Sequence, residues 1–185
     1  MTEEKKESWL NYLALTTVIL AVCATLSTFK GGGFSTRAVL TQSHAANQWA
    51  YYQAKSIKGY LHEIEKEKLE LELKVMGSRA PKSIVDDYEK KIESYSKNIK
   101  RYDEEKAQIQ KDAKNYEALH DDAQKHAQIF GIAVIFLQIA ILLSSIAALM
   151  KKKPVWVLGL ILGVFGVIYF INGFFLFLPV SYLLF

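Results

Sequence analysis

Residues 85–116 read VDDYEKKIESYSKNIKRYDEEKAQIQKDAKNY, a charged stretch in which an aromatic, apolar or small residue returns at almost every third or fourth position. The alternation of three and four continues to residue 130 without a slip. A repeat of 3.5 residues is typical of a coiled-coil helix, which packs along a second helix through one seam. The predicted seam on this arm contains Tyr88, Ile92, Tyr95, Ile99, Tyr102, Ile109 and Tyr116.

A looser repeat between residues 40 and 75 predicts the partner helix. Gly77 suits the position after a helix end and Pro81 suits a first helical position, so residues 77–83 form the expected tip. Because this connection is short, the two helices should be antiparallel and form a helical hairpin over residues 38–128. The predicted seam on the first arm contains Leu40, Ser43, Asn47, Ala50, Ala54, Ile57, Leu61, Ile64, Lys68, Leu71 and Val75.

Three apolar runs without a charged residue flank this hairpin, at residues 9–29, 129–150 and 155–178. Each reaches the roughly 20 residues that a helix needs to cross the hydrocarbon core of a bilayer. The sequence therefore predicts an all-α membrane protein with three transmembrane helices and a long antiparallel coiled-coil hairpin between the first and the second. Residues 30–37, which contain three consecutive glycines, are expected to form a hinge between the first span and the hairpin.

The basic residues of the short flanking segments predict the orientation. Lysines occur before the first span, within residues 1–8, and in the turn at residues 151–154, whereas the tail at residues 179–185 has no Lys or Arg. The positive-inside rule places the first two segments in the cytoplasm and the hairpin and the tail outside, although Lys30 and Arg37 oppose this mildly. Anionic lipid headgroups are the expected contacts of Lys151, Lys152 and Lys153.

An aromatic cluster lies in residues 47–58, which read NQWAYYQAKSIK. Trp49 and Tyr52 fall off the predicted seam, and Tyr51 lies to its other side. These residues form either the outer edge of the same two-helix stalk or a contact face between neighbouring subunits. We favour the contact face, because a two-stranded stalk has little depth in which to bury a Trp.

Small and polar residues also occur within the apolar runs. Gly159, Gly163 and Gly166 permit close helix approach within or between subunits, and we expect them to contribute to an oligomer interface. Gln138 and Asn172 either form hydrogen bonds between helices, which we favour, or line a pore in an oligomer. Ser145 is a third candidate for the lining of such a pore.

The aromatic cluster carries a family resemblance through Trp49, Ala50, Tyr52, Gln53, Ala54, Lys55, Ser56, Ile57 and Lys58. This motif resembles bacterial membrane proteins catalogued as domain of unknown function 4337, and the order of the apolar and charged segments is similar too. The resemblance implies a bacterial membrane location, and hence an inner membrane with a periplasmic hairpin. It implies no activity and transfers no catalytic or ligand-binding residue.

No pattern of catalytic, metal-binding or cofactor-binding residues is recognisable in the sequence. The four histidines lack the paired spacing of a zinc site, and the glycine run lacks the lysine and hydroxyl of a phosphate-binding loop. Residues 30–128 hold 18 basic and 16 acidic residues, and a net charge of only +2 argues against nucleic acid as a partner. We therefore expect no enzyme and no cofactor.

Two functions remain from the sequence. The first is a homo-oligomeric inner-membrane protein with a structural or interaction role, which presents coiled-coil stalks outside the membrane and offers the tip at residues 77–83 to a protein partner. The alternative is an oligomeric channel whose pore is lined by the three polar residues of the spans.

Overall fold

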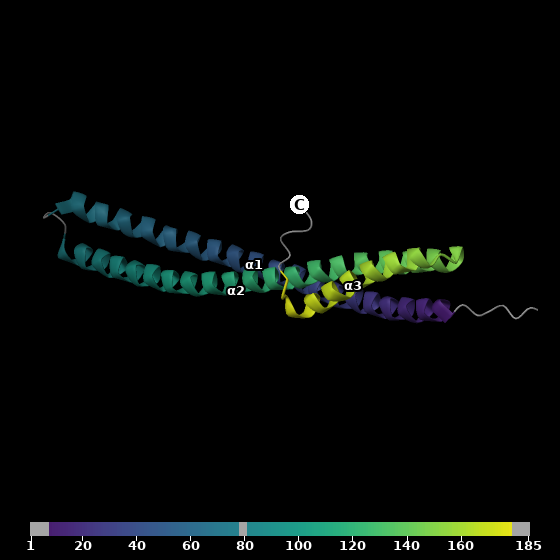
Figure 1. The fold of residues 1–185 in the computed structure, drawn as a ribbon. Coiled ribbons are helices and arrows are strands. Elements are labelled where there is room, and N and C mark those ends of the chain that lie inside the picture. The colour runs from purple at the N-terminus through teal and green to yellow at the C-terminus, as the bar shows by residue number, and fades with distance from the viewer. Residues whose placement is uncertain (1–7, 78–80, 179–185) are drawn as a thin grey trace, which may run out of the picture. The chain divides into compact units, whose positions relative to one another are not determined.

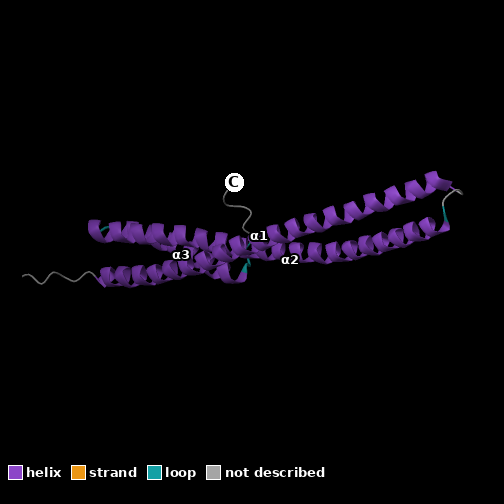
Figure 2. Cartoon of the chain, turned by 180° about the vertical axis from the view of Figure 1, so that it is seen from behind, coloured by secondary structure: helices purple, strands orange, loops and turns teal. Residues whose placement is uncertain are grey.

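The computed structural model describes residues 8–77 and 81–178, which form three helices (Figure 1). Helix α1 covers Ser8–Met76, α2 covers Lys82–Met150 and α3 covers Lys153–Phe175. Apart from the connections and the end of α3, the described chain is helix, as Figure 2 shows. Each helix contains a segment that is long and apolar enough to cross a membrane. The fold is therefore all-α, with three helices that can span a bilayer.

The glycine-rich residues 30–37 lie inside α1, which runs through them without a break. The expectation that they separate the first span from the following helix was therefore wrong. A Cβ atom on Gly31 would lie 3.0 Å from the Cβ of Phe130, which belongs to α2. Glycine at this position lets the two helix backbones approach closely, and the helical hydrogen bonds persist.

By its internal contacts the chain divides into two units, of residues 1–40 with 119–185 and of residues 41–118. The core of the first unit forms where α1, α2 and α3 meet, around Leu20, Ala24, Ala133, Leu137 and Ala140. Five of the glycines of α3 and α1 lie against larger side chains of this unit, which allows three apolar helices to pack at short distance.

A tight turn joins α2 to α3. Lys151 adopts a left-handed conformation with φ of 51°, and the amide of Lys152 donates a hydrogen bond to the carbonyl of Ala147. Pro154 lies in the first turn of α3, where its missing N–H costs nothing. The third apolar run was expected to extend to residue 178, but α3 ends at Phe175 and Leu176 adopts the left-handed conformation that closes the helix.

In the second unit, α1 and α2 run side by side in opposite directions. Trp49 contacts Glu117 and Glu72 contacts Tyr88, so the residue number on one helix falls as the number on the other rises. At the far end α1 stops at Met76, and Gly77 follows with φ of 54°, a left-handed conformation that favours glycine. The carbonyl of Pro81 accepts the amide of Ile84 as α2 begins.

The predicted seam on the first helix was wrong. All eleven residues from Leu40 to Val75 in that pattern are exposed, and the side of α1 that faces α2 contains Ala45, Gly59 and His62 instead. The tyrosines of α2 meet this other side of α1. Tyr95 and Tyr102 lie against His62, and a Cβ on Gly59 would lie at an ordinary contact distance of 3.9 Å from the Cβ of Tyr102.

Candidate interaction surfaces

The tyrosines predicted for the seam of α2 do face α1. His62 of α1 lies between Tyr95 and Tyr102, with ring centroids 5.3 Å and 5.6 Å away, and His44 stacks on Tyr116 at 5.2 Å. Of the three isoleucines in the pattern, Ile109 is buried, and Ile92 and Ile99 are half-buried. The contact therefore combines aromatic and imidazole rings with aliphatic side chains of α2.

Glu72 of α1 and Tyr88 of α2 form a hydrogen bond near the end of the helix pair. The Tyr88 hydroxyl donates to the Glu72 carboxylate at 2.9 Å. The pKa of Tyr88 is raised, first because the hydroxyl donates this bond, and further because desolvation and the nearby negative charge disfavour a phenolate.

An ion pair joins the two helices nearer the middle of the second unit. The ammonium nitrogen of Lys55 lies 2.5 Å from a carboxylate oxygen of Glu105. Through this hydrogen bond the pKa of Glu105 is lowered and that of Lys55 is raised, so each group favours the charged form of the other. Arg101 lies one turn before Glu105, 3.7 Å from its other carboxylate oxygen.

Trp49 and Tyr52 find partners within the same chain. The indole N–H of Trp49 donates to Glu117 of α2 at 2.8 Å, and the Tyr52 ring meets the Trp49 ring edge-on at 5.6 Å. Tyr51 is half exposed, and the ammonium group of Lys55 lies 5.3 Å from its ring centroid. These contacts favour the first of the two interpretations of the cluster, the outer edge of the helix pair itself.

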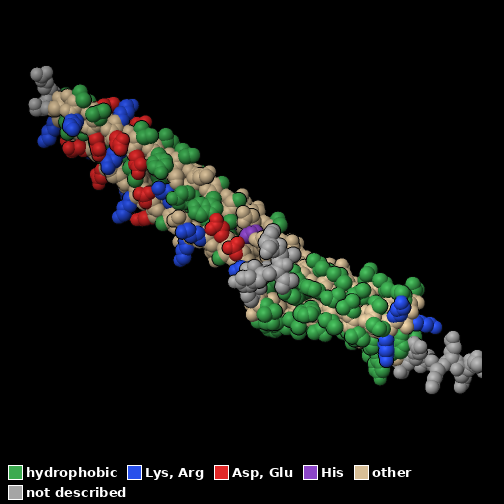
Figure 3. Space-filling view, turned by 45° about the horizontal axis from the view of Figure 1, so that its top comes forward, with side chains coloured by type: hydrophobic (Ala, Val, Ile, Leu, Met, Phe, Trp, Pro, Cys, Tyr) green, Lys and Arg blue, Asp and Glu red, His purple; other side chains and the backbone are tan. Residues whose placement is uncertain are grey.

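A row of apolar side chains covers the opposite side of α1, away from α2. We name it the outer stripe, and it comprises Ile57, Leu61, Ile64, Lys68, Leu71 and Val75. Its five apolar members are between 57% and 79% exposed. Along residues 82–118 of α2, in contrast, Ile84 is the only exposed large apolar side chain. Figure 3 shows that hydrophobic side chains lie between the charged ones on the face in view.

The outer stripe lies opposite the contact face because of helix geometry. Leu61 and Ile64 each follow by two residues a member of the α2-facing side, Gly59 and His62. Two residues correspond to about 200° around an α-helix. The more apolar side of α1 thus faces outward and the side with His62 and Lys55 faces α2.

The three glycines of α3 pack within the chain, which corrects their assignment to an interface between copies. A Cβ on Gly166 would lie 2.7 Å from Cγ of Leu137, and one on Gly163 would lie 3.0 Å from Cδ2 of Leu20. A Cβ on Gly159 would lie 3.2 Å from the carbonyl oxygen of Ala140. All three are buried, so the space beside them is already filled by α1 and α2.

The polar residues of the spans divide into two kinds. Asn172 is buried and binds the backbone of Leu178, because its amide oxygen accepts the Leu178 N–H at 2.8 Å and its amide nitrogen donates to the Leu178 carbonyl. It holds the chain after α3 and does not line a pore. Gln138 and Ser145 are exposed and lie seven residues apart on one side of α2. The Ser145 hydroxyl donates to the carbonyl of Ile141.

The basic turn presents Lys151, Lys152 and Lys153 as exposed side chains. In the same unit the indole N–H of Trp156 donates to the Thr16 hydroxyl at 3.3 Å. Trp156 also lies 6.0 Å from the ring of Trp9. A pair of tryptophans close to lysines is typical of the interface between a bilayer and water.

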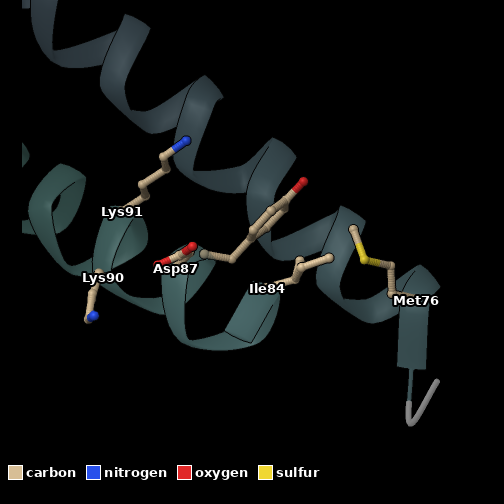
Figure 4. Close-up of a pocket in the computed structure, with 6 residues that line it drawn as sticks. Met76, Ile84, Asp87, Lys90 and Lys91 are labelled. Atoms are coloured by element: carbon tan, nitrogen blue, oxygen red, sulfur yellow. The ribbon is translucent and has the colours of Figure 1, made fainter. Parts of the chain in front are cut away.

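A shallow pocket lies where α1 ends and α2 begins, close to the expected tip. Met76 comes from the end of α1, and Ile84, Asp87, Tyr88, Lys90 and Lys91 come from the first turns of α2 (Figure 4). Ile84 points toward α1 in this view, and Lys90 points away from it. Part of the predicted tip, residues 78–80, lies outside the described residues.

Sequence reasoning missed a histidine contact in the first unit. The Nδ1 atom of His126 lies 2.7 Å from the carbonyl oxygen of Gly173, in the last turn of α3, and the Phe34 ring stacks on the imidazole at 4.4 Å. Likewise Nδ1 of His120 lies 2.9 Å from the carbonyl oxygen of Ala38. Both contacts join residues that are distant in the sequence, so no local spacing signals them.

Residues 8–77 and 81–178 contain no group of three or more His, Cys, Asp or Glu side chains that could hold a metal ion. Fold and surfaces together define an all-α protein with three helices able to cross a membrane and a charged pair of helices between two of the apolar segments. The family model described as Domain of unknown function (DUF4337) matches residues 9–176, and the chain belongs to this family. No curated protein and no solved structure matches the chain.

Proposed function

We propose that the protein is a membrane-anchored structural or interaction protein that assembles from several copies of itself. In this proposal α1, α2 and α3 cross a bacterial inner membrane, and residues 41–118 form an antiparallel coiled-coil hairpin on its outer side. No catalysis, cofactor or nucleic acid is part of the proposal. Membrane lipids and other copies of the chain are its partners. A further protein partner would bind at the connection between α1 and α2.

The outer stripe is the observation that carries the self-assembly. A two-helix unit buries only one side of each helix, and here the more apolar side of α1 remains outside. Full burial of an aliphatic side chain such as Leu61 or Ile64 contributes about 1.5–3 kcal/mol. An apolar row of this length on the extramembrane part of a protein marks an interaction site.

The orientation in this proposal follows from charge. The exposed Lys151, Lys152 and Lys153 would meet the anionic cytoplasmic leaflet, at about 1 kcal/mol for each basic residue near the surface. The hairpin then lies on the periplasmic side. A cysteine introduced at Glu63 in a Cys23→Ser background tests this orientation. In intact cells it should react with a membrane-impermeant maleimide.

The native mass of the full chain in nanodiscs tests the assembly. Native mass spectrometry is expected to show a defined multiple of the 21.0 kDa chain. A mass equal to one chain over the whole accessible concentration range would refute self-assembly and leave the membrane anchorage untouched.

A channel is the second candidate function, and Gln138 with Ser145 is the observation that favours it. Both lie on one exposed side of an apolar helix, so an assembly with that side inward would place two polar rings along its axis. Reconstituted protein in planar bilayers should then pass ions. Silent recordings at both polarities and under tension, from protein shown to be inserted, would eliminate this candidate.

A further inference from the structure

We infer that the outer stripe is the site at which α1 of one copy pairs with α1 of another, parallel and in register. The inference rests on the proposed self-assembly and specifies its surface and its direction. It concerns Ile57, Leu61, Ile64, Lys68, Leu71 and Val75, which are all exposed.

The spacing of the outer stripe points to a helix as the occupant. Its members follow one another at intervals of four, three, four, three and four residues. This is the repeat by which one helix packs against another along a supercoiled seam, and the contact with α2 is already made by the other side of α1. Position a of the heptad is then occupied by Leu61, Lys68 and Val75, and position d by Ile57, Ile64 and Leu71.

A second copy of the chain fits this seam better than α2 of a neighbour does. The outward side of α2 along residues 82–118 is charged, and its only exposed large apolar side chain is Ile84. Among the described residues of the second unit, the outward side of α1 carries a row of five exposed aliphatic side chains, which Lys68 interrupts once. A self-contact buries this row on both partners at once, as a symmetric interface does.

Lys68 supplies the charge complementarity that a parallel, in-register pair requires. Lys68 is exposed, and no ion pair involves it among the described residues. At position a, its side chain enters a hole formed by four residues of the facing helix. In register and parallel, this hole includes Lys68 of the other copy, which carries a like charge, and Glu67, an exposed carboxylate that offsets this charge. Lys68 thereby selects the register, as a single polar residue at position a does.

The direction follows from the continuity of α1. Because α1 is a single helix from its apolar segment to Met76, copies anchored in one membrane extend this helix in the same direction.

Single cysteines on the full chain, in native membranes and in a Cys23→Ser background, test this arrangement. Ile57→Cys and Leu71→Cys lie on the outer stripe, and Glu63→Cys is the matched control on an exposed side of the same helix. Mild oxidation, or a short bis-maleimide, is expected to link Ile57→Cys to itself and Leu71→Cys to itself several-fold more than the control. The native mass of each variant is measured in parallel.

Four other outcomes overturn the inference. If only a mixture of the Ile57→Cys and Leu71→Cys chains forms links, the helices pair in the antiparallel direction about Ile64. If neither variant forms links although the native mass remains that of an oligomer, the outer stripe is not the interface, yet the proposed self-assembly stands. If the links join the chain to a different protein, the occupant is not a second copy. A native mass of one chain refutes both proposals together.

Discussion

The imidazole ring of His62 on α1 stacks on the phenol ring of Tyr102 on α2, with centroids 5.6 Å apart and planes 16° apart. The same imidazole lies 5.3 Å from Tyr95, one heptad earlier. A flat polar ring thus occupies a contact position that an aliphatic residue fills in most paired helices. The α2-facing side of α1 thus carries polar rings beside the half-buried Leu69 and Leu73, whereas the five aliphatic residues of the outer stripe are exposed.

Loss of the stacked pair is expected to loosen the middle of the second unit. His62→Ala and Tyr102→Ala, combined in a double-mutant cycle, should show a coupling free energy of about 0.5–1.5 kcal/mol, the range for stacked ring pairs. Hydrogen exchange of the amides around residues 55–66 reports the local opening. Glu63→Ala, on an exposed position beside His62, serves as the control, and a coupling near zero would show that the rings merely lie close.

The ion pair of Lys55 and Glu105 gives the second unit a pH dependence with two limbs. The pKa of Glu105 is lowered in the folded chain, so its stabilisation is complete above the ordinary pKa of a Glu and disappears as the pH falls through the folded value. The pKa of Lys55 is raised, so its stabilisation is complete below the ordinary pKa of a Lys and disappears as the pH rises through the folded value.

Hydrogen-exchange protection in the second unit, corrected for intrinsic rates, should therefore decline at both acidic and alkaline pH. Glu105→Gln should weaken both limbs, because the ion pair is then absent at every pH. Glu104→Gln, an exposed neighbour, is the matched control. An identical pH profile for wild type and Glu105→Gln would contradict the assigned role of the pair.

Trp49 is expected to matter for the helix pair and not for the assembly. Trp49→Phe removes the indole N–H that donates to Glu117, so local protection from exchange should fall by about 0.5–1.5 kcal/mol, the usual net contribution of a hydrogen bond. The native mass should remain that of the wild type. A change of mass with unaltered protection would instead support the aromatic cluster as a contact face between subunits.

The glycines of the first unit are expected to fall into two classes. Gly166→Ala places a methyl group 2.7 Å from Cγ and 3.0 Å from the backbone nitrogen of Leu137, and should destabilise the unit by about 1–3 kcal/mol. Gly33→Ala meets no atom within 4 Å inside a helix, and should stabilise it by about 0.5–1 kcal/mol. Denaturant titration in detergent measures both. Destabilisation by Gly33→Ala would instead support a hinge at residues 30–37.

The sequence predicts those parts of the fold whose signals are local. The three apolar runs, the tyrosine repeat of α2 and the helix end at Gly77 depend on neighbouring residues alone, and the structure places the helices and the left-handed Gly77 accordingly. The glycine run led to the wrong prediction of a hinge, because a glycine-rich composition indicates flexibility. In the structure, Gly31 instead allows α1 to approach Phe130 of α2 closely. Only the folded chain brings those two residues together.

The candidate surface was harder to predict for a related reason. The heptad pattern of Ile57, Leu61 and Ile64 was recognised, but it was assigned to the contact with α2, because a repeat shows that a helix has a partner and not which partner it has. Gly59 and His62 give no apolar signal, yet they form the side that accepts the tyrosines.

The native mass of Leu61→Asp/Ile64→Asp in nanodiscs, compared with that of wild type, tests the central claim most directly. Asn115→Asp/Ala118→Asp is the matched control, because it adds two carboxylates at the same spacing on exposed positions of α2. Since two acidic residues in the outer stripe would be buried without partners, the first variant is expected to have the mass of one chain, and the control that of the wild-type oligomer. Retention of the wild-type mass by Leu61→Asp/Ile64→Asp would contradict assembly through α1.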